Sequence, residues 1–264
     1  MWSAKKRSMA DGKLPKNETL PKNGTLPKNG TLKVAAIGDI HVGETSVHPY
    51  RELFREIADR ADVLVLAGDL TNHGKPREAE ILAEDLRGIG IPVVAVLGNH
   101  DHECGHVEEL QHILEQAGVH FLDGNPQEIR GVGFAGVKGF GGGFENRMLD
   151  AFGEPTIKQF VHEAVNEAMR LESALRQLET ERTMVVLHYA PIADTVQGEP
   201  PEIFPFLGSS RLAETIDRFH VRAVVHGHAH HGSYSGKTMR GTPVYNVAQT
   251  IEKETGRPYA LIEV

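Results

Sequence analysis

The amino-acid sequence predicts an α/β protein, and three observations favour this fold class. First, five short runs in the 264-residue chain are rich in Val, Ile and Leu and stop at Gly or polar residues, which is typical of buried strands. Second, segments with apolar residues at helical spacing lie between these runs, and this alternation indicates α/β layering. Third, Asp, Asn or His residues end each run, always in the same direction along the chain. Because the carboxyl ends of parallel strands lie along one sheet edge, we expect these polar residues to converge.

The predicted elements follow one another in a regular order. The five runs, written with the polar residues that end them, are 34–41 (VAAIGDIH), 63–70 (VLVLAGDL), 93–101 (VVAVLGNHD), 184–191 (MVVLHYAP) and 223–230 (AVVHGHAH). Helical patterns, several of them bounded by Pro, Ser or Gly, lie at 53–61, 79–89, 107–117, 156–178 and 212–219. Further short strands, without helices between the last of them, are predicted at 132–137, 244–247 and 259–264. These later strands predict a second, mixed sheet.

The composition is that of an ordinary soluble globular protein, with 40% apolar and 24% charged residues. A chain of this length holds one large or two small domains, either with a sound core. No apolar run approaches the ~20 residues of a membrane span, and the sequence starts without a signal-peptide pattern. The single cysteine, Cys104, excludes an internal disulfide and agrees with a reducing compartment. We therefore expect a cytoplasmic protein.

The net charge of −8 is unevenly distributed along the chain. Residues 1–33 hold eight Lys or Arg and two acids, a net charge of +6, which leaves −14 for the remainder. Such an acidic body is a poor surface for nucleic acid, because phosphate contacts require Lys and Arg. Residues 14–31 repeat LPKN(E/G)T three times and hold little apolar mass, which predicts disorder. We therefore expect a solvated, disordered basic tail at 1–31 and one folded domain at 32–264.

Seven side chains at the predicted strand ends are candidate metal ligands: Asp39, His41, Asp69, Asn99, His188, His226 and His228. Asp39 and His41 are two residues apart in an extended segment, which places both side chains on one face, and His226 and His228 repeat this spacing. Asp69 has two carboxylate oxygens and can bridge two ions. Seven ligands are too many for one metal and suit two. Carboxylates mixed with imidazoles and an amide indicate Mn, Fe, Zn or Ni rather than Ca or Mg.

The order of these motifs resembles that of the calcineurin-like metallophosphoesterases, whose signature reads D-x-H, G-D, G-N-H-D, H and G-H-x-H. The match extends from Asp39 to His230. The resemblance implies a four-layer α/β/β/α sandwich of two mixed β-sheets flanked by helices, with two divalent or mixed-valence metal ions at the strand ends. Carried over motif by motif, it gives one metal to Asp39, His41, Asp69 and His228, and the other to Asp69, Asn99, His188 and His226.

The same resemblance implies a hydrolytic mechanism. His100 would be a catalytic, non-ligand histidine near the substrate phosphate, and Asp101 would orient it. A water bound between the metals would lose its proton, and the hydroxide would attack phosphorus in line. His100 would then stabilise the charge or protonate the departing alkoxide. Two divalent ions, two aspartates and one hydroxide give a formal charge of +1. This charge slightly favours a phosphodiester monoanion over a dianionic monoester.

The sequence also departs from some relatives of this family. The Ser/Thr protein phosphatases place arginines near the G-D and G-N-H motifs, whereas 68–74 (GDLTNHG) and 96–101 (VLGNHD) contain no Arg. A protein phosphatase is therefore not expected, and Asn72 or His73 is the candidate that reaches the substrate instead.

Four further histidines flank the site and are expected to support it or to face solvent rather than to bind metal: His102, His106, His230 and His231.

Three segments are predicted to form the rim of the site. Residues 139–144 (GFGGGF) lack the Lys-Ser/Thr of a nucleotide-binding loop and indicate a flexible turn. Residues 193–207 contain Phe204 and Phe206 and are either a lid over an apolar leaving group or an ordinary surface loop. Residues 45–50 are the third rim segment.

The sequence therefore predicts a metal-dependent phosphoesterase that hydrolyses a small-molecule phosphate ester, with a phosphodiester preferred. Two alternatives remain open. One is a phosphomonoesterase, and the other is a non-catalytic scaffold with the same fold. The presence of all seven candidate ligands and of His100 disfavours the scaffold.

Overall fold

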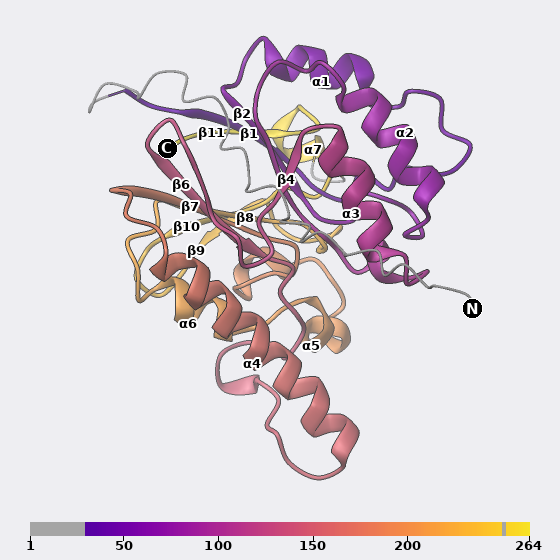
Figure 1. Cartoon of the computed structure of the whole chain (residues 1–264). Helices are drawn as coiled ribbons and strands as arrows, with labels where there is room; N and C mark the ends of the chain where they lie inside the picture. The colour runs from indigo at the N-terminus through magenta and orange to yellow at the C-terminus, as the bar shows by residue number, and fades with distance from the viewer. Residues whose placement is uncertain (1–29, 250–251) are drawn as a thin grey trace, which may run out of the picture.

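The computed structural model describes residues 30–249 and 252–264, so the predicted basic tail lies outside the described residues except for its last two positions. Two β-sheets lie face to face, and helices cover the outer face of each (Figure 1). This is the four-layer α/β/β/α arrangement that the sequence predicts.

The first sheet has the strand order β11-β1-β2-β3-β4. Four of its strands are parallel: β1 (Lys33–Ile37), β2 (Val63–Ala67), β3 (Val93–Val96) and β4 (Val119–Phe121). The edge strand β11 (Ala260–Glu263) pairs antiparallel with β1. Every residue of β2 is buried, as expected for a parallel strand that is covered on both faces.

The second sheet has the strand order β5-β6-β7-β8-β10-β9. Its four central strands are parallel: β6 (Val132–Val137), β7 (Arg182–Leu187), β8 (Ala223–His226) and β10 (Pro243–Asn246). Its two edge strands, β5 (Gln127–Ile129) and β9 (Ser235–Lys237), are antiparallel to their neighbours. Both sheets are therefore mixed.

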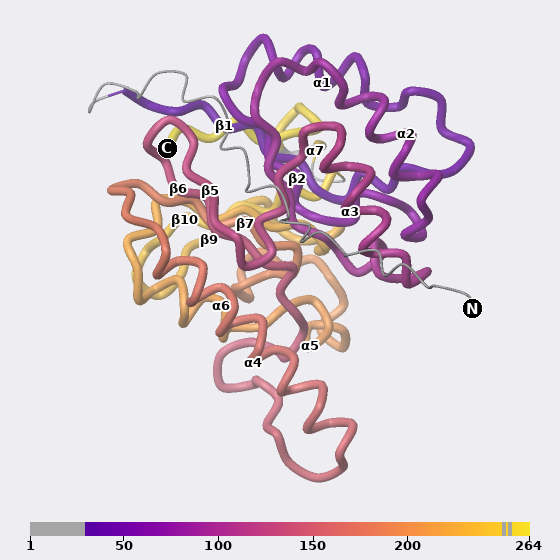
Figure 2. Tube along the Cα trace, in the orientation of Figure 1, coloured from indigo at the N-terminus to yellow at the C-terminus, as the bar shows by residue number. Residues whose placement is uncertain are grey.

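Helices cover the two outer faces. The first sheet is covered by α1 (Arg51–Ala58), α2 (Pro76–Leu86) and α3 (Val107–Gln116), and the second by α4 (Pro155–Arg176) and α6 (Ser210–Ile216). The remaining helices are short: α5 (Phe204–Leu207), α7 (Glu252–Thr255), η1 (His100–His102), η2 (Glu145–Arg147), η3 (Asp194–Val196) and η4 (Pro201–Ile203). The tube in Figure 2 shows that the start of α4, with the loop before it, projects beyond the sheets.

Alternation along each strand divides the core between the layers. In β2, Leu64 and Leu66 pack with the cluster that includes Phe54 of α1, whereas Val63 and Val65 join a separate cluster. This second cluster also contains residues of β6, β7 and β8, so it fills the space between the two sheets. A third cluster joins the second sheet to α4 and α6. The sequence alternation thus produces three buried apolar interfaces.

The predicted strands and helices are confirmed, with ends shifted by a few residues. Three short strands are not predicted from the sequence, namely β4, β5 and β9, and each has three residues. Within residues 30–249 and 252–264, none of the helices combines the length and apolar character needed to cross a bilayer.

Candidate metal centre

The carboxyl ends of five parallel strands bring polar side chains from distant parts of the sequence together. Each of β1, β2, β3, β7 and β8 is followed by one or two of them, as the sequence predicts. Two groups could each hold a metal ion, with candidate ligand atoms that lie within 4.8 Å of one another. The first group is Asp39, His41, Asp69 and His230, and the second is Asp69, His188 and His228. Because Asp69 belongs to both groups, its carboxylate is in position to bridge two ions.

The backbone is unusual at the residues that supply these side chains. Four of them have left-handed conformations, with φ of 56° at Asp39, 43° at His41, 48° at Asp69 and 68° at His228. A non-glycine residue in this region costs about 1–3 kcal/mol and persists only where surrounding contacts enforce it. The left-handed backbone at these strand ends lowers the stability of the chain, but it places the four side chains at the site.

Glycines in the motifs allow the strand ends to approach one another closely. A Cβ atom at Gly98 would collide with the Asp69 carboxylate, and one at Gly227 would collide with the Asp39 carboxylate. These two glycines are therefore required for space. This is the physical reason why Gly precedes Asn99 and His228 in the sequence.

His230 occupies the place beside Asp39, His41 and Asp69 that the sequence analysis gives to His228, and His228 joins Asp69 and His188. The His230 Nε2 atom lies 2.9 Å from Asp39 Oδ1, and this hydrogen bond raises the pKa of His230. The backbone N–H of His228 also donates to Asp39, at 3.0 Å from each carboxylate oxygen. The segment after β8 therefore places two imidazoles, those of His228 and His230, beside the aspartates.

His226 lies outside both groups, and its role as a metal ligand stays a prediction. It is the last residue of β8 and is fully buried. Its Nδ1 atom donates to the carbonyl of Gly227 at 2.7 Å, and its Nε2 atom lies 2.8 Å from Thr195 Oγ1. Burial lowers the pKa of His226 to about 4, so the ring is neutral and both nitrogens are already engaged. Residue spacing alone could not show which pair of histidines faces the aspartates, because His226 and His228 are two residues apart and so are His228 and His230.

His188 has the environment of a neutral metal ligand. It is fully buried, and burial holds its pKa well below the ordinary value. Its Nδ1–H donates to the carbonyl of Ala67 at 3.1 Å, which fixes the tautomer. The unprotonated Nε2 then lies 2.9 Å from Asn99 Oδ1 and 3.4 Å from Asp69 Oδ1. Lone pairs from three groups therefore face one point, and a cation there would be attracted by all of them. The contact to His188 also places Asn99 at this point.

His41 provides the strongest sign that the site binds a cation. Both of its ring nitrogens are buried without a hydrogen-bond partner among the described residues. The Nε2 atom is 3.8 Å from Asp69 Oδ2. A buried polar atom without a partner costs about 1–3 kcal/mol, so such atoms are rare unless they bind something. A transition-metal ion would supply the missing partner, and the residues of both groups fit such an ion.

The catalytic candidate His100 lies at the edge of the two groups. Its backbone N–H donates to Asp69 Oδ1 at 2.9 Å, and its ring packs edge-on to His41 with centroids 4.6 Å apart. The Nδ1–H donates to the carbonyl of Asn72 at 2.7 Å, which directs Nε2 to within 4.0 Å of Asp69 Oδ2. His100 thus presents one free ring nitrogen to the site. The Asn72 side chain instead contacts the exposed ring of His73 at 2.9 Å.

The Asp101 carboxylate contacts the loop after β2 and the loop after β3, and its expected role in orienting the His100 ring stays a prediction. Its buried carboxylate accepts hydrogen bonds from three backbone N–H groups and one hydroxyl, those of Leu70, Thr71 and Gly98 at 2.6–3.2 Å. Burial raises its pKa to about 6. Asp101 therefore ties the loop after β2 to the loop after β3. The carbonyl of Asn72 orients His100, and a backbone acceptor leaves no sequence signal.

We expect Asp101→Ala to destabilise the protein by about 3 kcal/mol, because several buried N–H donors would lose their only acceptor. Urea unfolding followed by circular dichroism measures this effect. Asp150→Ala removes the same charge at an exposed position and is the matched control. A loss below about 1 kcal/mol in Asp101→Ala, or an equal loss in the control, would contradict the tying role.

The predicted rim segments pack against each other beside the centre. Backbone N–H groups of Gly142 and Gly143 donate to the carbonyls of Pro205 and Gly208, at 2.6 and 2.9 Å. The carbonyl of Phe206 accepts a hydrogen bond from His228 Nε2 at 3.2 Å. Residues 193–207 therefore touch a candidate ligand, although their action as a lid stays a prediction.

The other flanking histidines lie outside the two groups. His102 is exposed, and partial desolvation of its ring lowers its pKa. His106 is exposed and lies 3.5 Å from a carboxylate oxygen of Glu109. His231 donates its backbone N–H to Glu199 at 2.7 Å. Among the four flanking histidines, only His230 joins a ligand group.

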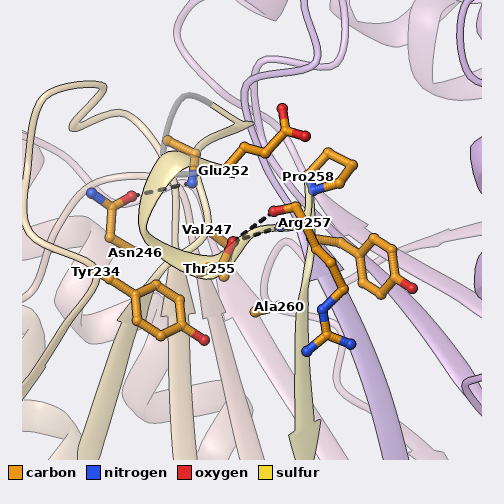
Figure 3. Close-up of a pocket in the computed structure, with 10 residues that line it drawn as sticks. Tyr234, Asn246, Val247, Glu252, Thr255, Arg257, Pro258 and Ala260 are labelled. Carbon is orange, nitrogen blue, oxygen red and sulfur yellow. Dashed lines mark hydrogen bonds between the residues drawn. The ribbon is translucent and has the colours of Figure 1, made fainter.

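Figure 3 shows a separate pocket, formed by β10, α7 and the start of β11. Polar groups in its lining pair with one another. The Asn246 oxygen accepts from the N–H of Ala248 at 3.2 Å, and the Thr255 hydroxyl donates to the carbonyl of Arg257 at 2.6 Å. The lining contains no candidate ligand. This pocket is therefore not part of the metal centre.

Two curated proteins match parts of the chain. A glycerophosphodiester phosphodiesterase GpdQ of Enterobacter lignolyticus is 29% identical over 92 residues, which cover 35% of this chain and 30% of that protein. A DNA double-strand break repair protein Mre11 of Methanopyrus kandleri is 33% identical over 106 residues, which cover 33% of this chain and 23% of that protein. The chain thus spans less than a third of the length of these two relatives.

A solved structure shares the fold. The phosphopantetheinyl hydrolase of Mycobacterium tuberculosis superposes with a TM-score of 0.63 at 14% identity, over 87% of this chain and 95% of that one. At this level of identity the likeness supports the fold alone. The family model described as calcineurin-like phosphoesterase matches residues 32–232, which is most of the chain and includes every candidate ligand. The chain therefore belongs to the calcineurin-like phosphoesterase family.

Proposed function

We propose that this protein is a metal-dependent phosphodiesterase with a binuclear centre. The observation that carries the proposal is the pair of ligand groups that share Asp69, together with the unsatisfied ring nitrogens of His41. In this proposal one metal is held by Asp39, His41, Asp69 and His230, and the other by Asp69, Asn99, His188 and His228. Mn, Fe, Zn and Ni ions suit such mixed oxygen and nitrogen sets.

Two metal ions, when bound, supply Lewis acidity and lower the pKa of a water so that it can act as a nucleophile. The protein contributes position and charge. The Nδ1 proton of His100 is held by Asn72, so its Nε2 is the atom that faces the substrate. In its imidazolium form, with Nε2 also protonated, His100 would stabilise negative charge on the phosphoryl oxygens or give the Nε2 proton to the departing alkoxide. Asp101 keeps the two loops that carry Asp69 and Asn99 together.

A phosphodiester substrate is supported by two independent considerations. The GpdQ relative is named as a glycerophosphodiester phosphodiesterase. The expected positive charge of the loaded centre also suits a monoanionic diester better than a dianionic monoester. The Mre11 relative is named as a DNA repair protein, but the acidic body of this chain does not favour a nucleic-acid surface.

The domain boundaries and the location are also part of the proposal. The family match begins at residue 32, and β11 closes the first sheet by pairing with β1, so residues 32–264 form the proposed domain. Cys104 is an exposed free thiol, which suits a reducing compartment such as the cytoplasm.

We expect that metal-loaded protein hydrolyses bis(4-nitrophenyl) phosphate faster than 4-nitrophenyl phosphate. Removal of metal with a chelator and dialysis should abolish both activities, and Mn²⁺ should restore them. The assay compares kcat/KM for the two esters, with elemental analysis of each sample. A preference for the monoester would favour a phosphomonoesterase. Fully loaded protein that hydrolyses neither ester would favour the scaffold.

A further inference from the structure

Tyr189 is a buried residue of the site that the sequence analysis does not single out. It follows His188 at the end of β7 and is 8% exposed. Its ring centroid lies 4.4 Å from that of His228 and 5.4 Å from that of His188. The tyrosine therefore contacts two histidines of one candidate ligand group.

The Tyr189 ring is buried, but its hydroxyl is not among the fully buried polar atoms that lack a partner, so an incoming ligand can reach it. A tyrosine hydroxyl, whose ordinary pKa is about 10, is protonated at neutral pH. A protonated hydroxyl can donate to an anionic oxygen that enters the site.

The fold holds the Tyr189 ring in place. The backbone N–H of Tyr189 donates to the carbonyl of Lys138 at 3.0 Å, and the ring packs against Phe140 with centroids 5.8 Å apart. Gly139 has φ of 78°, and a Cβ there would lie 3.2 Å from the Tyr189 Cβ atom. This glycine thus permits the 139–144 segment to press against the tyrosine. A ring fixed in this way orients its hydroxyl at little cost in entropy when a ligand binds.

A half-buried cation lies beside the same ring. The Lys138 ammonium nitrogen is 5.2 Å from the Tyr189 ring centroid and 5.0 Å from that of Phe140. The Lys138 ammonium group also donates a hydrogen bond to the carbonyl of Gly139 at 2.9 Å. A positive charge beside the ring favours the approach of an anion.

We propose that the Tyr189 hydroxyl is a further substrate-binding group, which donates a hydrogen bond to a phosphate oxygen of the ester at the metal centre. This inference rests on the proposed function, because it concerns the phosphate of the same substrate. It gives the chain a protein-derived phosphate contact where the Ser/Thr protein phosphatases use arginine.

Tyr189→Phe tests this role, because the substitution keeps the ring and removes only the hydroxyl. Binding of inorganic phosphate to Mn²⁺-loaded protein is measured by titration calorimetry. We expect the dissociation constant to rise about tenfold or more, as for the loss of a hydrogen bond to a charged acceptor. Tyr245→Phe is the matched control, since Tyr245 lies on β10 and pairs with Val225 in the sheet. This control should bind phosphate as the parent does.

A second measurement separates substrate binding from a structural role. With bis(4-nitrophenyl) phosphate, kcat/KM of Tyr189→Phe should fall about tenfold to a hundredfold, while the metal content and Tm stay unchanged. Phosphate affinity within twofold of the parent would overturn the inference, and so would a loss of metal in the variant. Absence of metal and of hydrolysis in the parent would instead overturn the proposed function itself, which makes the two failures distinguishable.

Discussion

Asp69→Asn is expected to lower kcat/KM for the diester by about 10³-fold or more, because a bridging ligand stabilises both metals and, through them, the transition state. The carboxylate lies in both ligand groups. It also accepts the backbone N–H of His100 at 2.9 Å, so the substitution should disturb the catalytic histidine as well. Elemental analysis should show less than two metals bound for each chain.

The fold should survive Asp69→Asn, since asparagine has nearly the same shape and tolerates the left-handed conformation that Asp69 adopts, with φ of 48°. Far-ultraviolet circular dichroism of the metal-free protein tests this point. His100→Asn is the companion variant, which should lose turnover while it retains both metals. If either variant keeps activity within tenfold of the parent, the role given to that residue is wrong.

His230→Ala is expected to weaken metal binding, whereas His226→Ala is expected to lower the free energy of unfolding. His230→Ala removes a candidate ligand that contacts Asp39 at 2.9 Å, so the metal affinity should fall by about a hundredfold or more. His226→Ala removes a buried ring that bonds to Thr195, so it should lower the free energy of unfolding by about 2–4 kcal/mol. Metal titration and urea unfolding of both variants measure the two quantities.

This pair of variants decides between two readings of the same sequence pattern. A loss of metal affinity in His226→Ala that exceeds the loss in His230→Ala would restore the original assignment of His226. The stability measurement must be made on metal-free protein, because bound metal stabilises whichever variant still holds it. A parallel His231→Ala variant, at a position outside both groups, controls for the loss of an imidazole from this segment.

The layers of the fold were predictable because each long element carries its own burial pattern. The run VLVLA of β2 is apolar at every position, and its buried residues divide between two clusters on opposite faces. The strands β4, β5 and β9 escaped because three residues are too few to show alternation. Their pairing depends on neighbouring strands that provide an edge, and local sequence does not contain this information.

Most of the site was also predictable, because the topology of parallel strands fixes where their ends meet. Six of the seven candidate ligands gather as expected, with Asn99 placed by its contact to His188. The exception arises from a local turn. His228 has φ of 68°, and this bend after β8 carries His230 to Asp39, whereas His226 stays in the buried strand. Residue spacing describes extended chain and cannot anticipate such a bend.

Asp101 shows a different limit of sequence reasoning. It adjoins His100 in the sequence, which suggests a contact between the two side chains. In the structure they belong to the short turn η1, and the Asp101 carboxylate points to backbone N–H groups of Leu70, Thr71 and Gly98. Backbone donors are the same at every residue, so no pattern of side chains could have revealed them.

The left-handed backbone at Asp39, His41, Asp69 and His228 has a consequence for protein engineering. A screen that selects only for heat resistance would favour glycine at these positions, since glycine adopts such angles without strain. Each gain of that kind would remove a proposed metal ligand. Directed evolution of this enzyme should therefore keep these four codons fixed and seek improved robustness on the outer helices, where stability and catalysis do not compete.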